Sequence, residues 1–243
     1  MKYTAVIPAR YAASRFPGKL MKLLNGKPVI VHTYEQTVAT GLFDDVLVVT
    51  DSDLIFSEIT GIGGKVVRSV REHESGTDRI AEIAPALDTD VIINVQGDEP
   101  FVLKQPLQQL CRLFDEEQTQ VASLMHAITD ARQITDPNAV KVVVNRHMEA
   151  LYFSRSAIPY LRDPKVEVCY YKHIGVYAYR KDILLKITQL PPTLLEQAEK
   201  LEQLRMLENG IRIKMALTEP WSISIDTPED LERAEKIFSK KSV

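Results

Sequence analysis

A short segment near the N-terminus, IPARYAASRFPGK, contains three cations and no acid. The cations are Arg10, Arg15 and Lys19, and Ser14 adds a hydroxyl. Arginine offers phosphate oxygens a planar fork and lysine a point charge, so we predict that this loop binds a polyphosphate. The alternative is a solvated loop with three surface charges. The glycines of a Walker loop or a GxGxxG motif are missing, which argues against an ATPase or a dehydrogenase.

Two aspartates, Asp98 and Asp226, are candidates for holding a divalent cation beside such phosphates. Asp98 lies in NVQGDEP, where Gly97 and Pro100 predict a tight turn. Asp226 precedes Thr227, which can cap the last helix by itself. Proteins usually hold Mg²⁺ through one or two carboxylates together with substrate phosphates. We therefore predict an Mg²⁺ site at this pair, although either acid alone could serve a turn or a helix terminus.

Other polar groups have simpler interpretations by spacing alone. The stretch SGTDR opens a helix, and its N-terminus favours anions or a base carbonyl. Spacing alone favours the alternative, an ordinary capped helix with Asp78 and Arg79 in solvent. His173 is a lone histidine in an apolar strand, a pattern typical of a packed side chain. Glu202 and Gln203 lie on a predicted helix whose charged face is most simply solvated.

The elements that position these residues alternate between strands and helices in the first half of the chain. The predicted strands are YTAVIP (3–8), DVLVVT (45–50), KVVRSV (65–70) and DVIINV (90–95). Helices are expected from Pro28 towards Thr40, over 54–59, and after a cap at Thr77. Apolar strands joined by helices indicate a doubly wound, mostly parallel α/β sheet covered on both faces. Ligands of such sheets bind beyond the carboxyl ends of the strands.

The second half is less regular. VASLMHAI, AVKVVV, ALYFS and HIGVYAYR predict strands, some of them antiparallel, and LLEQAEKLEQLRMLENG predicts one amphipathic helix ended by Gly210. TPEDLERAEKIF predicts a last helix with Thr227 as N-cap, Pro228 at the first position and Asp230 as the capping-box acid. Asp226 would then follow the strand-like alternation WSISI. We expect one domain over 1–243 with an insertion at approximately 125–190.

Composition limits the class of protein. The chain has 243 residues, of which 26% are charged and 45% hydrophobic, a globular balance. A net charge of −3 gives no general attraction to nucleic acid. No apolar run approaches the ~20 residues of a membrane span, and no basic leader is evident. Cys111 and Cys169 are too distant in sequence to suggest a metal clip or a disulfide framework. We expect a soluble cytosolic protein.

Several stretches together resemble one family along the whole chain. They are IPARYAASRFPGK, HESGTDR, NVQGDEP, NAVKVVV, ALYFSRSAIP, HIGVYAYR, LEQLRMLENG and DTPEDLERA. In this order they are similar to the 3-deoxy-manno-octulosonate cytidylyltransferase family, also called CMP-Kdo synthetases. Other sugar nucleotidyltransferases share the fold but usually have a Gly-rich loop where this chain has PARYAAS.

The resemblance implies transfer of CMP from CTP to the anomeric hydroxyl of Kdo, with release of pyrophosphate, for lipopolysaccharide synthesis. It also implies a homodimer to which the second-half strands contribute. Carried onto this chain, it implies that the CTP phosphates are held by Arg10, Ser14, Arg15 and Lys19. Ser75 and Gly76 would lie near the cytosine, and Asp98 and Asp226 would bind Mg²⁺. The sugar-acid pocket would be lined by Gln96, Arg155, His173, Tyr177, Glu202 and Gln203.

The expected chemistry is in-line attack of the sugar hydroxyl on the α-phosphorus. Positioning and charge stabilisation would supply most of the rate, with Arg15 and Lys19 neutralising the leaving group. Trp221 stands where relatives often have a Gly-containing segment, so we expect it to reshape the acceptor entrance. The alternatives are a cytidylyltransferase for another sugar acid and a nucleotide-binding module without turnover.

Overall fold

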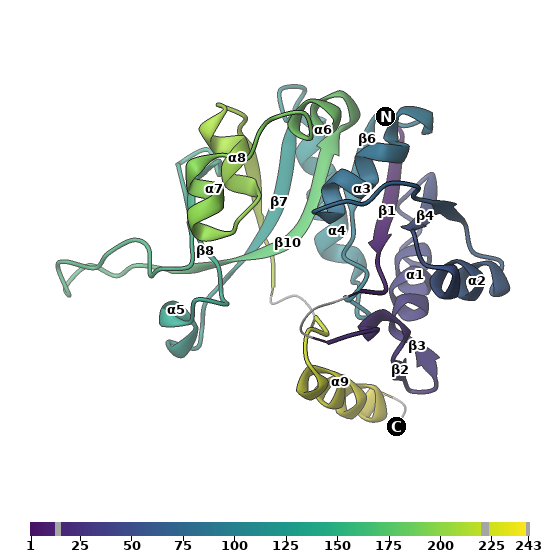
Figure 1. Cartoon of the computed structure of the whole chain (residues 1–243). Helices are drawn as coiled ribbons and strands as arrows, with labels where there is room; N and C mark the ends of the chain where they lie inside the picture. Colours follow the sequence, from purple (N-terminus) through teal and green to yellow (C-terminus); the bar gives the residue numbers. More distant parts are fainter. Residues whose placement is uncertain (13–15, 220–223, 242–243) are drawn as a thin grey trace. The chain divides into compact units, whose positions relative to one another are not determined.

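The computed structural model describes residues 1–12, 16–219 and 224–241 (Figure 1). The predictions made for Ser14, Arg15 and Trp221 therefore lie outside the described residues. The chain forms two compact units. The first comprises Met1–Lys104 and Ser222–Val243, and the second comprises Gln105–Trp221. The predicted insertion at approximately 125–190 falls within the second unit.

The first unit is built on four parallel strands in the order β6-β1-β4-β5. Their bounds are β1 (Tyr3–Ala9), β4 (Asp45–Thr50), β5 (Val66–Arg68) and β6 (Val91–Asn94). Ala5 of β1 lies opposite Val46 on one side and Ile93 on the other, and β1 and β6 have almost no exposed side chain. This burial on both faces explains why these strands lack polar alternation. The predicted parallel sheet is confirmed.

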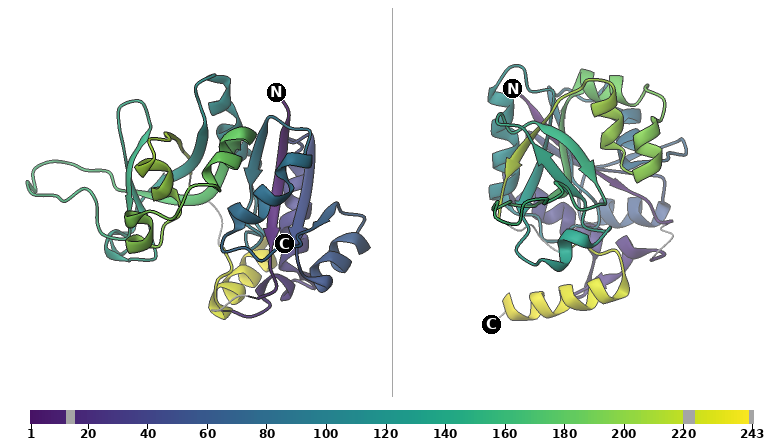
Figure 2. Two further views of the ribbon diagram at one scale, coloured as in Figure 1. Left: turned by 45° about the horizontal axis from the view of Figure 1, so that its top comes forward. Right: turned by 90° about the vertical axis from the view of Figure 1, so that its left-hand side faces the viewer.

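Helices cover both faces of this sheet. These helices are α1 (Val29–Ala39), α2 (Asp53–Gly61) and α3 (Gly76–Ile83). The unit also contains the last helix α9 (Pro228–Lys241), the short turns η1 (Lys19–Met21) and η2 (Ala84–Ala86), and the small hairpin of β2 (Leu23–Leu24) and β3 (Lys27–Pro28). Right-handed crossovers place α1 and α2 on one face and α3 on the other, as Figures 1 and 2 show. The doubly wound α/β fold predicted from the sequence is therefore confirmed.

Two local predictions in this unit were wrong. The N-cap of α3 is Ser75 rather than Thr77, because the Ser75 hydroxyl accepts a hydrogen bond from the amide of Asp78 at 3.1 Å. The strand predicted over 65–70 pairs only over Val66–Arg68. Beyond that point the Ser69 amide still donates to the Thr50 carbonyl at 3.0 Å, but the Val70 amide and the Ser69 hydroxyl bond to a side chain of α3.

The second unit contains the strands expected in the second half of the chain, and several of them pair antiparallel as predicted. They are β7 (Val121–Ala127), β8 (Lys141–Val144), β9 (Ala150–Ser154), β10 (Tyr171–Arg180) and β11 (Ile213–Leu217). β10 is antiparallel to β7 and β8, β9 is antiparallel to β8, and β11 is parallel to β7. The helices of this unit are α4 (Lys104–Arg112), η3 (Leu113–Asp115), α5 (Arg132–Thr135), α6 (Lys181–Ile187), α7 (Leu194–Glu199) and α8 (Gln203–Glu208).

The single amphipathic helix predicted before Gly210 is in fact two helices, α7 and α8. The chain turns at Lys200, whose φ of 53° is left-handed. The break lets Arg205 of α8 reach Glu196 of α7 with two hydrogen bonds of 2.6 and 2.8 Å. Residues nine apart in one continuous helix point to opposite sides, so this ion pair requires the break. Gly210, with a φ of 72°, ends the second helix as predicted.

The last helix begins as its capping box predicts. The Thr227 hydroxyl accepts from the Asp230 amide at 3.2 Å, and the Asp230 carboxylate accepts from the Thr227 amide at 2.9 Å. Phe238 then packs its ring 4.8 Å from that of His32 and 5.1 Å from that of Phe101. These contacts hold α9 against the rest of the first unit. No helix in the described part of the chain is long and apolar enough to cross a membrane.

Candidate active site

The first unit has a pocket of about 230 Å³ at the carboxyl edge of its parallel sheet. Arg10 follows β1 and Asp98 follows β6, and these strands are neighbours in the sheet. Their ends therefore deliver both side chains to one edge. Of the residues predicted for the site, the pocket wall includes Arg10, Lys19, Ser75, Gly76, Gln96, Asp98 and Asp226.

Gly97 lets the turn that carries Asp98 pack closely on β1. A Cβ atom built on Gly97 would lie 3.1 Å from the Pro8 carbonyl oxygen and 3.3 Å from side-chain atoms of Leu20 and Ile30. Such distances to a strand backbone are too short for a larger residue without movement of the turn. The position of Asp98 at the pocket thus depends on the absence of a side chain beside it.

Asp98 and Asp226 converge on one cationic group, the Lys19 ammonium. Lys19 Nζ donates to Asp98 Oδ2 and, at 2.9 Å, to Asp226 Oδ1. The Lys19 side chain is only 17% exposed. Burial by itself opposes the ammonium charge, but the two carboxylates outweigh it and raise the pKa of Lys19. One cation is therefore shared by two acids that lie far apart in the sequence, Asp98 and Asp226.

The backbone also holds the two acidic segments together. The amide of Ile225, a fully buried residue, donates to the Asp98 carbonyl at 2.9 Å. The expectation that Asp226 ends an apolar strand was wrong for residues 224–226, which are irregular. A capping-box bond from the Asp226 amide to Asp230, at 3.1 Å, orients the aspartate instead. Helix capping, rather than a strand, positions the second acid.

This arrangement fits a divalent cation bound by two protein carboxylates. Both acids already reach one positive centre, and a hard cation prefers carboxylate oxygens. Among residues 1–12, 16–219 and 224–241, no group of three or more His, Cys, Asp or Glu side chains is placed to hold a metal. The two aspartates would therefore leave several coordination positions to phosphate or water oxygens, which is the usual mode for Mg²⁺. The predicted contact of Lys19 with phosphate stays a prediction.

The N-terminus of α3 forms another wall of the pocket. Gly76 approaches β1 so closely that a Cβ atom would lie 3.0 Å from the Pro8 ring. One turn later, Arg79 is buried and donates to Asp51 at 2.7 Å. The expectation that Arg79 lies in solvent was therefore wrong. Its second amino nitrogen, Nη1, is buried and has no hydrogen-bond partner among the described residues.

The loop before α3 contains a site residue that sequence reasoning missed. His73 lies in the pocket wall, and its Nε2 atom lies 2.8 Å from Glu82 of α3. Burial opposes the Glu82 charge, but hydrogen bonds from Ser69, His73 and the Val70 amide lower its pKa to about 2. The only sequence signal was the position of His73 two residues before SGTDR, since Glu82 looks like an ordinary helical acid.

The second unit holds five of the residues implied for the sugar-acid pocket, whereas Gln96 lies in the first. Arg155 follows β9, and its guanidinium donates to the carbonyls of Glu199 at 2.7 Å and Pro137 at 2.9 Å. Its backbone amide donates to the Glu199 carboxylate at 2.9 Å. Arg155 thus fastens the end of α7 to the sheet of this unit. Gln203, at the start of α8, is buried.

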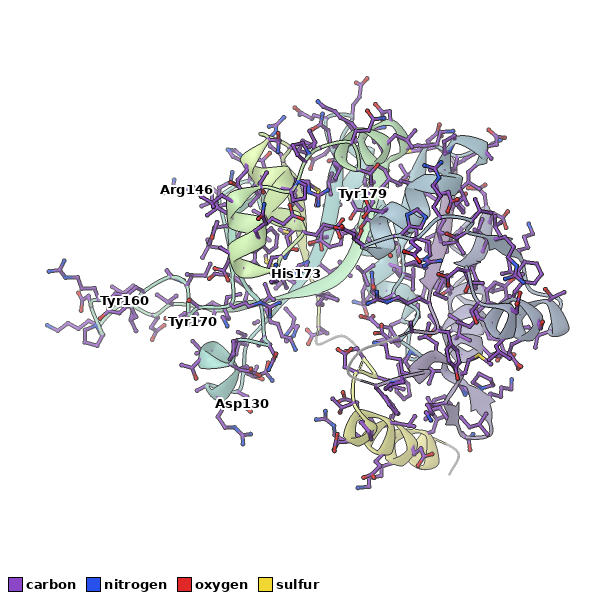
Figure 3. The ribbon with its side chains drawn as sticks, in the orientation of Figure 1. Asp130, Arg146, Tyr160, Tyr170, His173 and Tyr179 are labelled. Atoms are coloured by element: carbon purple, nitrogen blue, oxygen red, sulfur yellow. The ribbon has the colours of Figure 1, made fainter. Side chains whose placement is uncertain are left out.

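His173 and Tyr177 lie in an aromatic cluster on β10, in which Tyr177 is buried and His173 is half-buried. Figure 3 labels His173 and Tyr179 on this strand. The His173 ring lies 5.0 Å from Phe153 and 5.3 Å from Tyr177, and its Nε2 is 3.1 Å from the Ser123 hydroxyl. Burial lowers the pKa of His173 to about 3, so its ring is neutral at neutral pH. Burial, with smaller contributions from Tyr179 and the Glu202 charge, raises the pKa of Tyr177.

Comparisons with known proteins agree with the character of the site. Residues 4–213 match the family model described as cytidylyltransferase. The chain is 57% identical to the 3-deoxy-manno-octulosonate cytidylyltransferase of Flavobacterium johnsoniae over 96% of this chain and 97% of that protein. It is 54% identical to the enzyme of the same name from Christiangramia forsetii, over 98% and 97% of the two chains.

A solved structure is similar over its full length. It is a CMP:2-keto-3-deoxy-manno-octonic acid synthetase complexed with CTP, with a TM-score of 0.95 and 41% sequence identity. The match covers 99% of this chain and 100% of that one.

Proposed function

The chain belongs to the 3-deoxy-manno-octulosonate cytidylyltransferase family, and we propose that it transfers CMP from CTP to the anomeric hydroxyl of Kdo, releasing pyrophosphate. The product would serve lipopolysaccharide synthesis. The observation that carries this proposal is the convergence of Asp98 and Asp226 on one cation in a pocket at the sheet edge. Binding alone rarely needs two acids at the place where a phosphate must lie.

The transfer makes one bond and breaks one. The Kdo hydroxyl oxygen bonds to the α-phosphorus, the bond from that phosphorus to the bridging oxygen breaks, and the hydroxyl proton is lost. Such transfer needs positioning and charge stabilisation more than covalent help from the protein. Arg10 and Lys19, with Ser14 and Arg15, are the groups we propose for the triphosphate. Lys19 and Arg15 would stabilise charge on the departing pyrophosphate.

Asp98 and Asp226 are the groups we propose to hold Mg²⁺. When bound, the ion would neutralise charge on the α-phosphate and lower the pKa of the attacking hydroxyl. The chain's own part is to present both carboxylates to one point, by the glycine-containing turn before Asp98 and the helix cap after Asp226.

For the acceptor we propose Gln96 from the first unit, and from the second unit Arg155, His173, Tyr177, Glu202 and Gln203. In the second unit, the neutral imidazole of His173 and the phenol of Tyr177 form a rigid apolar surface with polar atoms. Hydroxyl-rich sugars are commonly bound by such surfaces, because apolar faces pack and a few polar groups orient the ligand.

We further propose that the enzyme is a homodimer that acts in the cytoplasm, where CTP is made. The second unit exposes apolar side chains that would favour association, with Tyr160 87% and Val166 53% exposed. Tyr160 and Tyr170 lie on the segment that leaves the body of this unit (Figure 3). Sedimentation equilibrium tests the dimer, because replacing Tyr160 and Val166 by serine should yield monomers.

A pyrophosphate-release assay over a panel of sugar acids, with and without a chelator, tests the proposed reaction. We expect release with CTP and Kdo that stops when Mg²⁺ is removed. Faster release with a nonulosonic acid would identify a cytidylyltransferase for another sugar acid. CTP binding without release for any acceptor would identify a nucleotide-binding module.

A further inference from the structure

The imidazole ring of His73 lies in the pocket wall, where it contacts the buried carboxylate of Glu82. Its side chain is 9% exposed and that of Glu82 is 8% exposed. Glu82 Oε2 accepts from the Ser69 hydroxyl at 2.6 Å and lies 2.8 Å from His73 Nε2. Glu82 Oε1 accepts from the Val70 amide at 3.1 Å. The loop that leads into the pocket is thus organised around this one carboxylate.

These contacts determine which nitrogen of a neutral His73 ring carries the proton. A carboxylate only accepts hydrogen bonds, so the nitrogen that faces Glu82 must be the N–H. The pKa of Glu82, near 2, keeps it a carboxylate at neutral pH. Nδ1 of the neutral ring is therefore left with a lone pair and acts as an acceptor.

Nδ1 is open for a ligand. Within the described ranges no group forms a hydrogen bond with this atom, and the atom is not fully buried. His73 lines the pocket, so a ligand bound there lies beside the residue whose one remaining polar atom is Nδ1. An accessible ring nitrogen that can only accept hydrogen bonds is suited to recognise an N–H group of a ligand.

The loop that carries His73 lies where the base of a bound nucleotide is expected. Its loop follows β5, whereas Asp98 follows β6, and β1 and β4 lie between these strands. The reacting phosphate of the proposed function lies at the acids. The base of the same nucleotide must then lie away from them, across the pocket.

We propose that His73 Nδ1 accepts a hydrogen bond from the exocyclic amino group of cytosine, and that Glu82 is a positioning residue that fixes the tautomer. This inference rests on the proposed use of CTP and names a source of its base specificity. Uracil has a carbonyl oxygen in place of the amino group, so its acceptor would face the Nδ1 lone pair. A binding site strongly disfavours a ligand that leaves a buried polar group of the protein without a hydrogen-bond partner.

The test compares binding of CTP and UTP to the full chain by calorimetry at mildly alkaline pH. For the wild type we expect CTP to bind at least about tenfold more tightly than UTP. H73F should remove the preference by weakening CTP more than UTP. H73Q should restore part of it, since glutamine can donate to Glu82 and accept from the amino group. E72Q is the matched control, because Glu72 is an exposed acid of the same loop and its change should leave the ratio unaltered.

E82Q gives the sharper result. The Val70 amide will hold the new side-chain oxygen, which turns the amide nitrogen towards His73. Nε2 must then accept, so the ring proton moves to Nδ1 and faces the pocket. We expect the preference to shift towards UTP, whose carbonyl can accept this proton. A merely structural role for Glu82 would weaken both nucleotides alike.

Nitrogen NMR of the wild-type histidines reads the tautomer without any substitution. We expect one ring to carry its proton on Nε2 and to change its Nδ1 signal with CTP but not with UTP. The inference is overturned if no ring does so, if H73F keeps the wild-type ratio, or if H73F weakens both nucleotides equally. Failure of the wild type to form CMP-Kdo would contradict the proposed function alone, because these binding ratios need no acceptor.

Discussion

Lys19 Nζ lies 2.9 Å from Asp226 Oδ1, and the same ammonium donates to Asp98. The lysine thus occupies the point at which the two carboxylates meet. A divalent ion bound by both acids would compete with this ammonium, because two cations cannot share the space between the same oxygens. Lys19 would then be released towards the triphosphate, where its charge is needed during transfer.

Replacing Lys19 by methionine should therefore tighten metal binding while slowing the reaction. In the absence of nucleotide we expect K19M to bind Mn²⁺ roughly tenfold more tightly than the wild type, a change of about 1.4 kcal/mol. Electron paramagnetic resonance of free Mn²⁺ measures this directly. K27M is the control, since Lys27 pairs with Glu35 on the surface. Equal or weaker Mn²⁺ binding by K19M would show that the ammonium does not compete.

Asp98→Asn and Asp226→Asn should each lower turnover by roughly 10³-fold or more, because each removes a charge from the proposed ion site. The unfolding temperature should change little by comparison, since asparagine still accepts a hydrogen bond from Lys19. Pyrophosphate release and a thermal melt measure the two effects. Asp53→Asn, at an exposed aspartate paired with Arg68, controls for the loss of one charge. Activity of D98N within a few-fold of wild type would remove Asp98 from the metal site.

Gly97→Ala tests the close approach that places Asp98. The new methyl group would meet the Pro8 carbonyl at 3.1 Å, so we expect destabilisation of about 1–3 kcal/mol and weaker Mn²⁺ binding. Denaturant unfolding gives the first quantity. Gly61→Ala, where nothing lies within 4 Å of the added atom, should be neutral or slightly stabilising. Equal unfolding free energies for G97A and the wild type would contradict the tight packing of this turn.

The pH dependence of stability should report the burial of His173. Its pKa falls from 6.5 to about 3 on folding, so the unfolded chain takes up the proton first. The contribution of this residue to stability is present above pH 6.5 and is lost as the pH falls towards 3. The stability of H173N should accordingly fall less than that of the wild type between pH 7 and pH 5. H147N, at an exposed histidine, should follow the wild type. Parallel curves for H173N and the wild type would mean that folding does not lower the pKa of His173.

Sequence patterns predicted the parts of the molecule that depend on short-range rules. Buried strands lack polar alternation, so 45–50 was predicted as a strand with its correct bounds. The capping box of Thr227 and Asp230 is a local motif, and it placed Asp226 beside the helix terminus. Because parallel strands end at one edge, the prediction that Arg10 and Asp98 share a pocket needed no coordinates.

The remaining features arise from contacts between distant segments, which spacing does not encode. Arg79 is buried because Asp51, at the end of another strand, neutralises its charge. The break at Lys200 depends on an ion pair across two helices. Likewise, the relation of His73 to Glu82 appears only once the loop folds back on α3.

Phosphorus NMR of wild-type protein mixed with CTP, Kdo and Mg²⁺ tests the central claim most directly. We predict that the CTP signals decline while a phosphodiester signal and inorganic pyrophosphate grow in equal amounts, and that D226N or an added chelator prevents the change. A spectrum in which CTP persists with the wild type, or in which D226N forms the phosphodiester at the wild-type rate, would contradict the proposal that these converging aspartates support cytidylyl transfer.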